Sequence, residues 1–221
     1  SKKDISECYG INPDKIDVAY NGANEIFTPV SQEIKDAIKD IYADSKPYFM
    51  FVGSLHPRKN LARLFTAFDI FKKRNNNNIQ LLIVGEKKWW TEPIKNAYEA
   101  MTHKDDVIFT GRLSAEDLHH VTASALASVY VSYFEGFGIP IVEAFRCDTP
   151  VITSNVTSMP EVAADAALLI DPFDVNSIAD AMEKVLNDDI RKELIEKGRI
   201  RCQDFSWDKA AEEWWKCIMK V

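Results

Sequence analysis

Two glutamates lie eight positions apart around a glycine-containing turn in the stretch FEGFGIPIVEAF. Glu135 precedes the turn, and Glu143 follows it on a helix that the pattern predicts to begin near Pro140. Glycines let a ligand approach the backbone closely, and the free N–H groups of a helix start attract anions or sugar hydroxyls. A carboxylate one turn into such a helix can accept both hydroxyls of a ribose. From the spacing alone, helix-dipole complementation by Glu143 and a solvated loop acid at Glu135 are equally good interpretations.

A second stretch, FVGSLHPRKN at residues 51–60, places positive charge at the end of an apolar run. Arg58 and Lys59 come directly before a helix expected to begin near Asn60. Charge-assisted donors beside a helix start suit a pyrophosphate. The alternative is that both side chains are solvated charges at the start of the helix.

Composition excludes several classes of partner. The 221 residues carry a formal net charge of −7, which argues against nucleic acid and anionic membrane as partners. No apolar run approaches the ~20 residues that span a bilayer, and the first residues do not resemble a signal peptide, so the chain is expected to be cytoplasmic. Its cysteines have no paired spacing, so neither a zinc site nor a disulfide framework is predicted.

Short apolar runs rich in Val, Ile, Phe and Tyr predict buried strands, and segments of helical period separate them. The runs begin at Lys15, Pro47, Ile79, Asp106, Ala127, Pro150 and Ala166. Strands that alternate with helices indicate an α/β protein with a doubly wound, mostly parallel, Rossmann-like sheet. Such sheets bind ligands in the crevice at the carboxyl ends of their strands, where both charged stretches are expected to lie.

The chain divides into three predicted parts. Residues 1–46 contain a short helix, the first strand and a Pro-containing connector, residues 47–172 form the strand–helix core, and residues 173–221 are helical. The last helix is expected to begin after Ser206 as N-cap. It carries the apolar residues Trp207, Trp214, Trp215, Ile218 and Met219. This is more apolar surface than a terminal helix needs, which predicts an interface with another domain.

Together the motifs resemble the donor-binding half of retaining glycosyltransferases of the GT-B fold, in the large group called family 4. The resemblance rests on VGSLHPRKN, on EGFGIPIVEA with its E-x7-E spacing, and on PVITSNVTSMPEVAADAALLIDPFD, and it covers nearly the whole chain. The opening DISECYGINPDKIDVAYNGANEIFTP is similar to the family's passage between domains, and FSWDKAAEEWWKCI to the helix that crosses back. The resemblance implies a nucleotide-diphosphate sugar as ligand, a missing N-terminal acceptor domain, and neither metal nor other cofactor.

The resemblance also implies roles for matched residues. Glu135 would hold sugar hydroxyls, Glu143 would hold the ribose, and Lys59 would bind the donor phosphates and stabilise the leaving diphosphate. Many members have an arginine where this chain has Ser54. Either Arg58 substitutes for that arginine, or the phosphates are bound more weakly.

The predicted donor site includes backbone positions as well. The amides of Phe137, Gly138 and Ile139 would meet the sugar and the distal phosphate, and the segment 111–113 would hold the base. The catalytic residues would be Glu135, Lys59 and Arg58. The whole predicted donor site comprises Gly53, Ser54, Arg58, Lys59, Gly111, Arg112, Leu113, Glu135, Gly136, Phe137, Gly138, Ile139 and Glu143.

The expected reaction is transfer of a hexose, with retention, to a glycan or lipid-linked acceptor. GDP-mannose is the first choice of donor because VGSLHPRKN resembles mannosyltransferases. Association with the inner face of a membrane would come only through the missing domain. A GT-B-fold nucleotide-sugar epimerase is an alternative, although the E-x7-E spacing favours a transferase. A flavodoxin-like regulatory module is a second alternative, but Glu135 lacks the partner aspartates that such a module needs.

Overall fold

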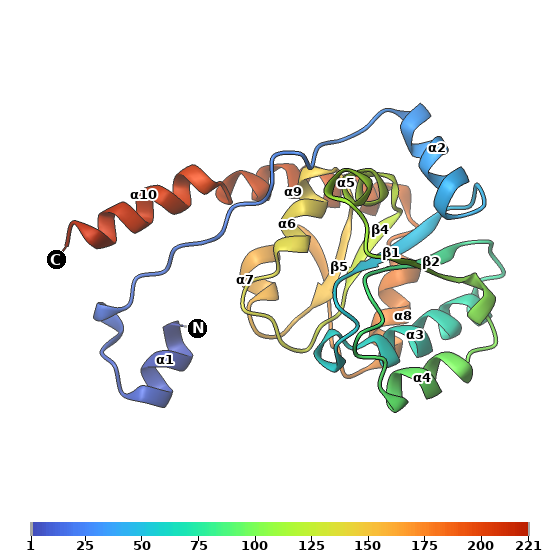
Figure 1. Ribbon diagram of the computed structural model, residues 1–221, viewed down its shortest axis with the longest axis horizontal. Coiled ribbons are helices and arrows are strands. Elements are labelled where there is room, and N and C mark those ends of the chain that lie inside the picture. The colour runs from blue at the N-terminus through green and yellow to red at the C-terminus, as the bar shows by residue number, and fades with distance from the viewer. Residues whose placement is uncertain (1, 221) are drawn as a thin grey trace.

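A computed structural model describes residues 2–220, and its core is one parallel sheet (Figure 1). The six strands lie in the order β3-β2-β1-β4-β5-β6, and every neighbouring pair is parallel. Their bounds are β1 (Tyr48–Val52), β2 (Gln80–Val84), β3 (Val107–Gly111), β4 (Ala127–Tyr130), β5 (Val151–Ser154) and β6 (Ala167–Ile170). Most positions in the four central strands are buried. Burial on both faces explains why these strands are continuous apolar runs without alternation.

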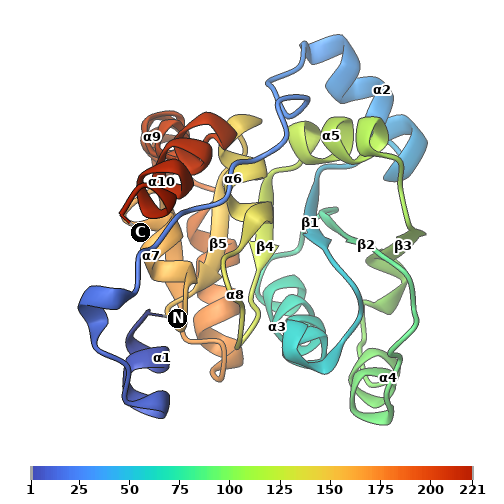
Figure 2. The same cartoon turned by 60° about the vertical axis from the view of Figure 1, so that its left-hand side comes forward.

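Helices cover both faces of the sheet (Figure 2). On one face, α3 (Leu61–Arg74) packs between α4 (Glu92–Glu99) and α8 (Val175–Lys184). On the other face, α2 (Gln32–Tyr42) packs on α5 (Ala115–Ser124), and α6 (Ile139–Arg146) packs on α7 (Met159–Ala163) and α9 (Asp188–Arg201). The expected doubly wound α/β fold is therefore confirmed.

The sheet order reverses between β1 and β4, which are neighbours at its centre. Connections from β1 lead outward to β2 and β3 on one side, whereas β4 leads to β5 and β6 on the other. In doubly wound sheets the ligand crevice lies at such a reversal, outside the carboxyl ends of the two strands. The residues that follow β1 and β4 are therefore expected to line the crevice.

The strand expected from Lys15 is not formed. Ile16 has extended backbone angles, but the described residues 16–24 pair with no strand. The segment instead runs beside α10 (Trp207–Ile218), as Figures 1 and 2 both show, and Lys220 Nζ lies 2.6 Å from Asp17 Oδ1. Apolar side chains can be buried against a helix, whereas a strand also needs a neighbouring strand with free backbone N–H and C=O groups. The prediction was wrong because the composition of the run indicates burial of its side chains and not pairing of its backbone.

The remaining six predicted strands and the helical C-terminal part are present. Ser206 caps α10 as expected, because its hydroxyl accepts a hydrogen bond from the backbone N–H of Lys209 at 3.1 Å. Trp214 and Trp215 on α10 are each 63% exposed. None of the helices in residues 2–220 is both long enough and apolar enough to cross a membrane.

The other described helices are short. A helix α1 (Lys2–Tyr9) opens the chain. Four 3₁₀ turns occur in the described residues: η1 (Pro13–Lys15), η2 (Pro57–Lys59), η3 (Lys104–Asp106) and η4 (Cys202–Asp204). Of these, η2 lies at the crevice, and it carries both cations of the second charged stretch.

Candidate functional site

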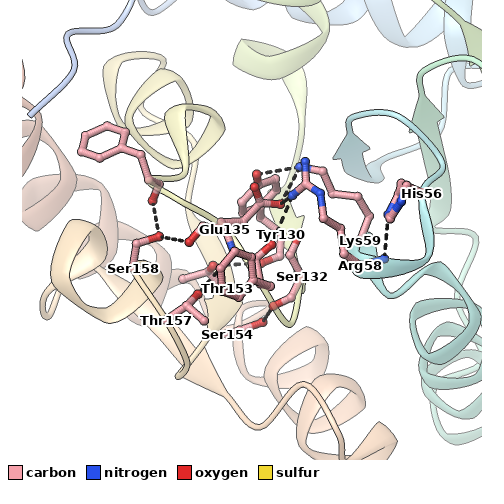
Figure 3. Close-up of polar contacts among 12 residues, drawn as sticks. His56, Arg58, Lys59, Tyr130, Ser132, Glu135, Thr153, Ser154, Thr157 and Ser158 are labelled. Atoms are coloured by element: carbon pink, nitrogen blue, oxygen red, sulfur yellow. Dashed lines mark hydrogen bonds and ion pairs between the residues drawn. The ribbon is translucent and has the colours of Figure 1, made fainter. Parts of the chain in front are cut away.

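Two cations and one carboxylate converge at the reversal of the sheet (Figure 3). Arg58 and Lys59 lie in η2 after β1, and Glu135 lies in the loop after β4. Glu135 Oε1 is 2.6 Å from Arg58 Nη1 and 2.7 Å from Lys59 Nζ. The structure therefore brings together the three residues predicted to be catalytic.

The turn that carries the cations is held by several hydrogen bonds. His56 Nδ1 accepts from the backbone N–H of Arg58 at 3.2 Å. Asn60 adopts a left-handed conformation with φ of 63°, which ends η2 and starts α3. Its side-chain amide donates to the carbonyl oxygens of Val131 at 3.1 Å and Pro172 at 2.7 Å. Asn60 thus ties the turn after β1 to the ends of β4 and β6. Arg58 also joins this turn to the loop of Glu135, because its carbonyl oxygen accepts from the N–H of Tyr133 at 3.1 Å and its Nη1 donates to the carbonyl oxygen of Phe134 at 3.1 Å.

Lys59 is buried among polar partners. Its Nζ donates to the hydroxyl of Tyr130 at 2.7 Å and lies 4.5 Å from the centre of that ring. Gly53, with φ of 147°, passes so close that an added Cβ would lie 3.1 Å from Lys59 Cε. Gly53 therefore has a structural reason to be glycine, because a larger residue would crowd the lysine.

Charge and burial act against each other in this cluster. Burial lowers the pKa of the Lys59 ammonium, and the neighbouring Glu135 only partly opposes that change. Burial by itself would raise the pKa of Glu135, but hydrogen bonds from Arg58 and Lys59 outweigh it and lower this pKa. Burial chiefly, and then Glu135, raises the pKa of Tyr130, so its phenol stays protonated and can donate. The carboxylate is ionised at neutral pH because two cations share it.

The glycine-containing loop is fastened to the segment before α7. Ser158 Oγ lies 2.9 Å from the carbonyl oxygens of both Glu135 and Phe137, and Thr157 Oγ1 accepts from the N–H of Glu135 at 3.3 Å. Gly138, with φ of 110°, forms the N-cap of α6. The first N–H groups of a helix have no partner within it. The loop therefore presents the predicted amides at the start of α6, while Gly136 has open space beside it.

Glu143 has different surroundings from Glu135. It is partly buried on α6, and within residues 2–220 no hydrogen bond or ion pair reaches its side chain. Burial raises its pKa to about 7. It lines a cavity of about 440 Å³ together with Gly22, Asn24, Glu25, Ile139 and Trp207. The second glutamate thus faces the start of α10 and the extended residues 16–24, which are called the connector from here on.

Other predicted residues line a third region. A cavity of about 490 Å³ lies over the ends of β1, β2 and β3, and its lining includes Gly53, Ser54, Arg112 and Leu113. Gly111, with φ of 73°, accepts a hydrogen bond from the N–H of Gly85 at 2.9 Å beside it. The predicted donor residues are therefore distributed over the cation cluster and two separate cavities.

The structure adds residues that the sequence interpretation missed. Glu86 and Lys88 line the cavity over β1 to β3, with Glu86 Oε2 2.6 Å from Lys88 Nζ. Glu86 lies two residues after the end of β2 at Val84, so the rule applied to β1 and β4 would have found it. Tyr130 was missed because it belongs to an apolar run, of which it forms the last strand residue, and nothing in the sequence marks its hydroxyl as functional. Among the described residues, no group of three or more metal-ligating side chains is arranged to hold a metal ion.

The doubly wound parallel sheet, with two cations where its order reverses, defines an α/β protein of the class that binds ligands at the carboxyl ends of its strands. The comparison with protein families then identifies the family. The model of the family "Glycosyl transferases group 1" matches residues 32–201, and the chain belongs to that family. The resemblance of the motifs to group 1 glycosyltransferases is thereby confirmed, whereas retention of configuration stays a prediction.

Related proteins are longer than this chain. Over 167 residues it is 34% identical to O-antigen chain mannosyltransferase B of Escherichia coli. The matched region covers 75% of this chain and 44% of that protein. Over 184 residues it is 30% identical to O-antigen chain mannosyltransferase RfbU of Salmonella typhimurium, which covers 83% and 48% respectively. The chain spans about half the length of these relatives.

A solved structure has the same fold. The structure of Anabaena Alr3699/HepE in complex with UDP and glucose superposes with a TM-score of 0.85, at 18% identity. The likeness covers 100% of this chain and 61% of that one. At this level of identity the comparison supports the fold alone.

Proposed function

We propose that this chain is the donor-binding part of a glycosyltransferase that transfers a hexose, with retention, from a nucleotide-diphosphate sugar to a glycan or lipid-linked acceptor. The observation that carries the proposal is the position of Arg58, Lys59 and Glu135 at the reversal of the sheet. Two cations there can bind a diphosphate, and a carboxylate beside them can accept sugar hydroxyls.

The ion pairs suggest how the donor enters. Without a ligand, Glu135 Oε1 supplies the negative charge next to Arg58 and Lys59. A bound diphosphate brings more charge to the same place, takes over the two cations and releases the carboxylate to the hydroxyls of the sugar. As the bond between the sugar and the distal phosphate breaks, negative charge grows on the leaving diphosphate. Lys59 and Arg58 stabilise that charge, and the proposed step needs no divalent metal.

The two cavities provide places for the rest of the donor. Glu143 would accept the ribose hydroxyls, and the base would occupy the cavity lined by Arg112 and Leu113. Glu86 at that cavity can accept the N–H donors of a guanine. The names of the two O-antigen mannosyltransferase relatives support GDP-mannose as the preferred donor.

We propose that the complete enzyme has an additional N-terminal acceptor domain. The length of the relatives supports this, as do the exposed tryptophans of α10. In this arrangement residues 1–46 and 173–221 connect the core of residues 47–172 to the other domain. Retaining transfer requires donor and acceptor to be held together with water excluded, which one open domain does not provide. This chain alone is therefore expected to bind donor without transferring sugar.

Calorimetry with GDP, UDP and ADP, each in the presence of a metal chelator, tests the proposal. We expect saturable binding of at least one nucleotide, with GDP the tightest. Lys46→Ala is a suitable control because Lys46 lies before the amino end of β1, whereas the cation cluster follows its carboxyl end. The proposal is wrong if the chain binds none of the three nucleotides.

A further inference from the structure

Three aromatic rings from distant parts of the chain meet beside the glycine-containing loop. Tyr20 comes from the connector, Phe137 from the loop itself, and Phe205 from the turn before α10. The ring centre of Tyr20 is 6.0 Å from that of Phe137 and 5.7 Å from that of Phe205, and the latter two are 5.6 Å apart. Each ring therefore contacts both of the others at distances typical of favourable aromatic pairs.

Tyr20, Phe137 and Phe205 are called the aromatic cluster. Two of its members contact neighbouring helices: Tyr20 is hydrogen-bonded to α7, and Phe205 packs on α9. The hydroxyl of Tyr20 donates to Glu161 Oε1 at 2.5 Å, and this hydrogen bond raises the pKa of the tyrosine. Phe205 is fully buried, and the guanidinium of Arg201 lies 4.7 Å from its ring centre. Arg201 also donates to the carbonyl oxygens of Glu161 at 2.6 Å and Val162 at 3.0 Å.

The connector and the start of α10 are also packed tightly against each other. A Cβ added to Gly22 would lie 2.5 Å from the backbone nitrogen of Trp207, closer than any real contact. The segment that enters the core and the segment that leaves it therefore meet at one place. Phe137 is the residue of the glycine-containing loop that contacts both.

Phe137 transmits this packing to the candidate site. Its carbonyl oxygen and that of Glu135 share Ser158 Oγ, so the ring of Phe137 and the carboxylate of Glu135 belong to one fastened loop. The predicted sugar-binding amides begin at Phe137. Lys59 and Arg58 have a further support, because Asn60 ties their turn to the ends of β4 and β6.

We infer that Tyr20 and Phe205 are positioning residues that couple the two connecting segments to the loop for the donor sugar. The assignment of that loop to the sugar rests on the proposed function. Loss of the Tyr20 ring removes one of two aromatic contacts that hold Phe137, so the loop becomes less ordered. The turn of Arg58 and Lys59 keeps its hydrogen bonds through Asn60 to the ends of β4 and β6, so most of the affinity for the bare nucleotide is retained.

The test uses the whole chain with Tyr20→Ala, Tyr20→Phe and, as control, Tyr9→Ala. Tyr9 is an exposed tyrosine on α1 and stands outside the aromatic cluster. Calorimetry gives the Kd of GDP and of GDP-mannose, with UDP and UDP-glucose as a second pair. From the energy of an aromatic pair, Tyr20→Ala should raise the Kd of the nucleotide sugar by about 3- to 10-fold relative to the Kd of the nucleotide. Tyr20→Phe keeps the ring, so its Kd for the nucleotide sugar should stay close to that of wild type. Tyr9→Ala should leave this Kd unchanged.

A second readout is independent of any ligand. Backbone NMR order parameters for residues 134–139 should fall in Tyr20→Ala and stay unchanged in Tyr20→Phe and Tyr9→Ala. If the wild-type chain binds neither ligand pair, the proposed function fails and the order parameters alone decide the coupling. Unchanged order parameters in Tyr20→Ala, or equal weakening of nucleotide and nucleotide sugar by that variant, would overturn the inference.

Discussion

The two glutamates around the glycine-containing turn have opposite electrostatic surroundings. Glu135 shares one oxygen with Arg58 and Lys59, and its pKa is lowered. Glu143 lies in α6 without a partner among the described residues, and burial raises its pKa to about 7. Residues of one type in one motif can therefore have opposite preferences for the proton.

This difference separates two ways of preparing a binding site. At Glu135 the cations and the acid are assembled before any ligand arrives, so a ligand has to exchange one set of charge pairs for another. At Glu143 the ionised form lacks donors, so a ligand that supplies hydroxyls relieves an existing cost. Variants and pH titrations should therefore affect the assembled cluster and the unpartnered acid differently.

The largest effect is expected from Lys59→Met, which keeps much of the side-chain volume but removes the buried charge. Loss of a charge-assisted hydrogen bond costs about 1.5 to 3 kcal/mol, so GDP should bind at least about 10-fold more weakly. Calorimetry with Lys46→Ala as control measures the change. Unaltered GDP affinity in Lys59→Met would show that the cluster does not bind the diphosphate.

Glu143→Gln should stabilise the chain above pH 7. The ordinary pKa of 4.5 is raised to about 7 in the folded state, so the folded state holds the proton more tightly. Stability contributed by the protonated acid is present below pH 4.5, declines as pH rises through this window, and is gone above about pH 7. A pKa unit corresponds to about 1.4 kcal/mol, so the gain from the neutral amide is roughly 1 to 3 kcal/mol, since the side chain is not fully buried.

Urea denaturation at pH 5 and pH 8 measures this gain. Glu135→Gln is the matched control from the other half of the comparison. The folded pKa of Glu135 is lowered, so its stabilisation is present above the ordinary pKa and is lost as pH falls. The control should therefore be less stable than wild type at pH 8. The contrast fails if both variants shift stability in the same direction at that pH.

Glu135→Gln should separate the sugar from the nucleotide in binding. The variant no longer competes with the diphosphate for Arg58 and Lys59, so GDP should bind as well as to wild type or better. The affinity for GDP-mannose should fall about 10-fold relative to the affinity for GDP, because the variant lacks a charged acceptor of sugar hydroxyls. Calorimetry of both ligands measures the ratio. Equal weakening of the two ligands would contradict the assignment of Glu135 to the sugar.

The smallest predicted effect is a pH dependence of GDP-mannose binding. The ionised carboxylate accepts from both ribose hydroxyls more strongly than the protonated acid does. Affinity should therefore rise by about 3-fold between pH 6 and pH 8, across the pKa of about 7 for Glu143. GDP-mannose suits this test because its diphosphate has no terminal phosphate that titrates in the range. Glu143→Gln should show a flat profile, and a slope that persists in this variant would place the titrating group elsewhere.

Much of the fold follows from the sequence. Parallel strands buried on both faces must be continuous apolar runs, and six such runs became β1 to β6. The strand expected from Lys15 has a similar composition, yet no neighbour pairs with it and Tyr20 packs on Phe137 and Phe205 instead. Composition indicates which side chains are buried, but it does not show whether they are buried in a sheet or against a helix.

The sequence by itself determined that Arg58, Lys59 and Glu135 follow apolar strands, and the rule for doubly wound sheets placed them in one crevice. Only the tertiary structure decided their partnership, because the shared oxygen depends on β1 and β4 being neighbours. It also decided that Glu143 has no partner, and that Tyr20 and Phe205 reach Phe137. Spacing along a chain sets the direction of a side chain within its own element, whereas burial and charge depend on elements far away in the sequence.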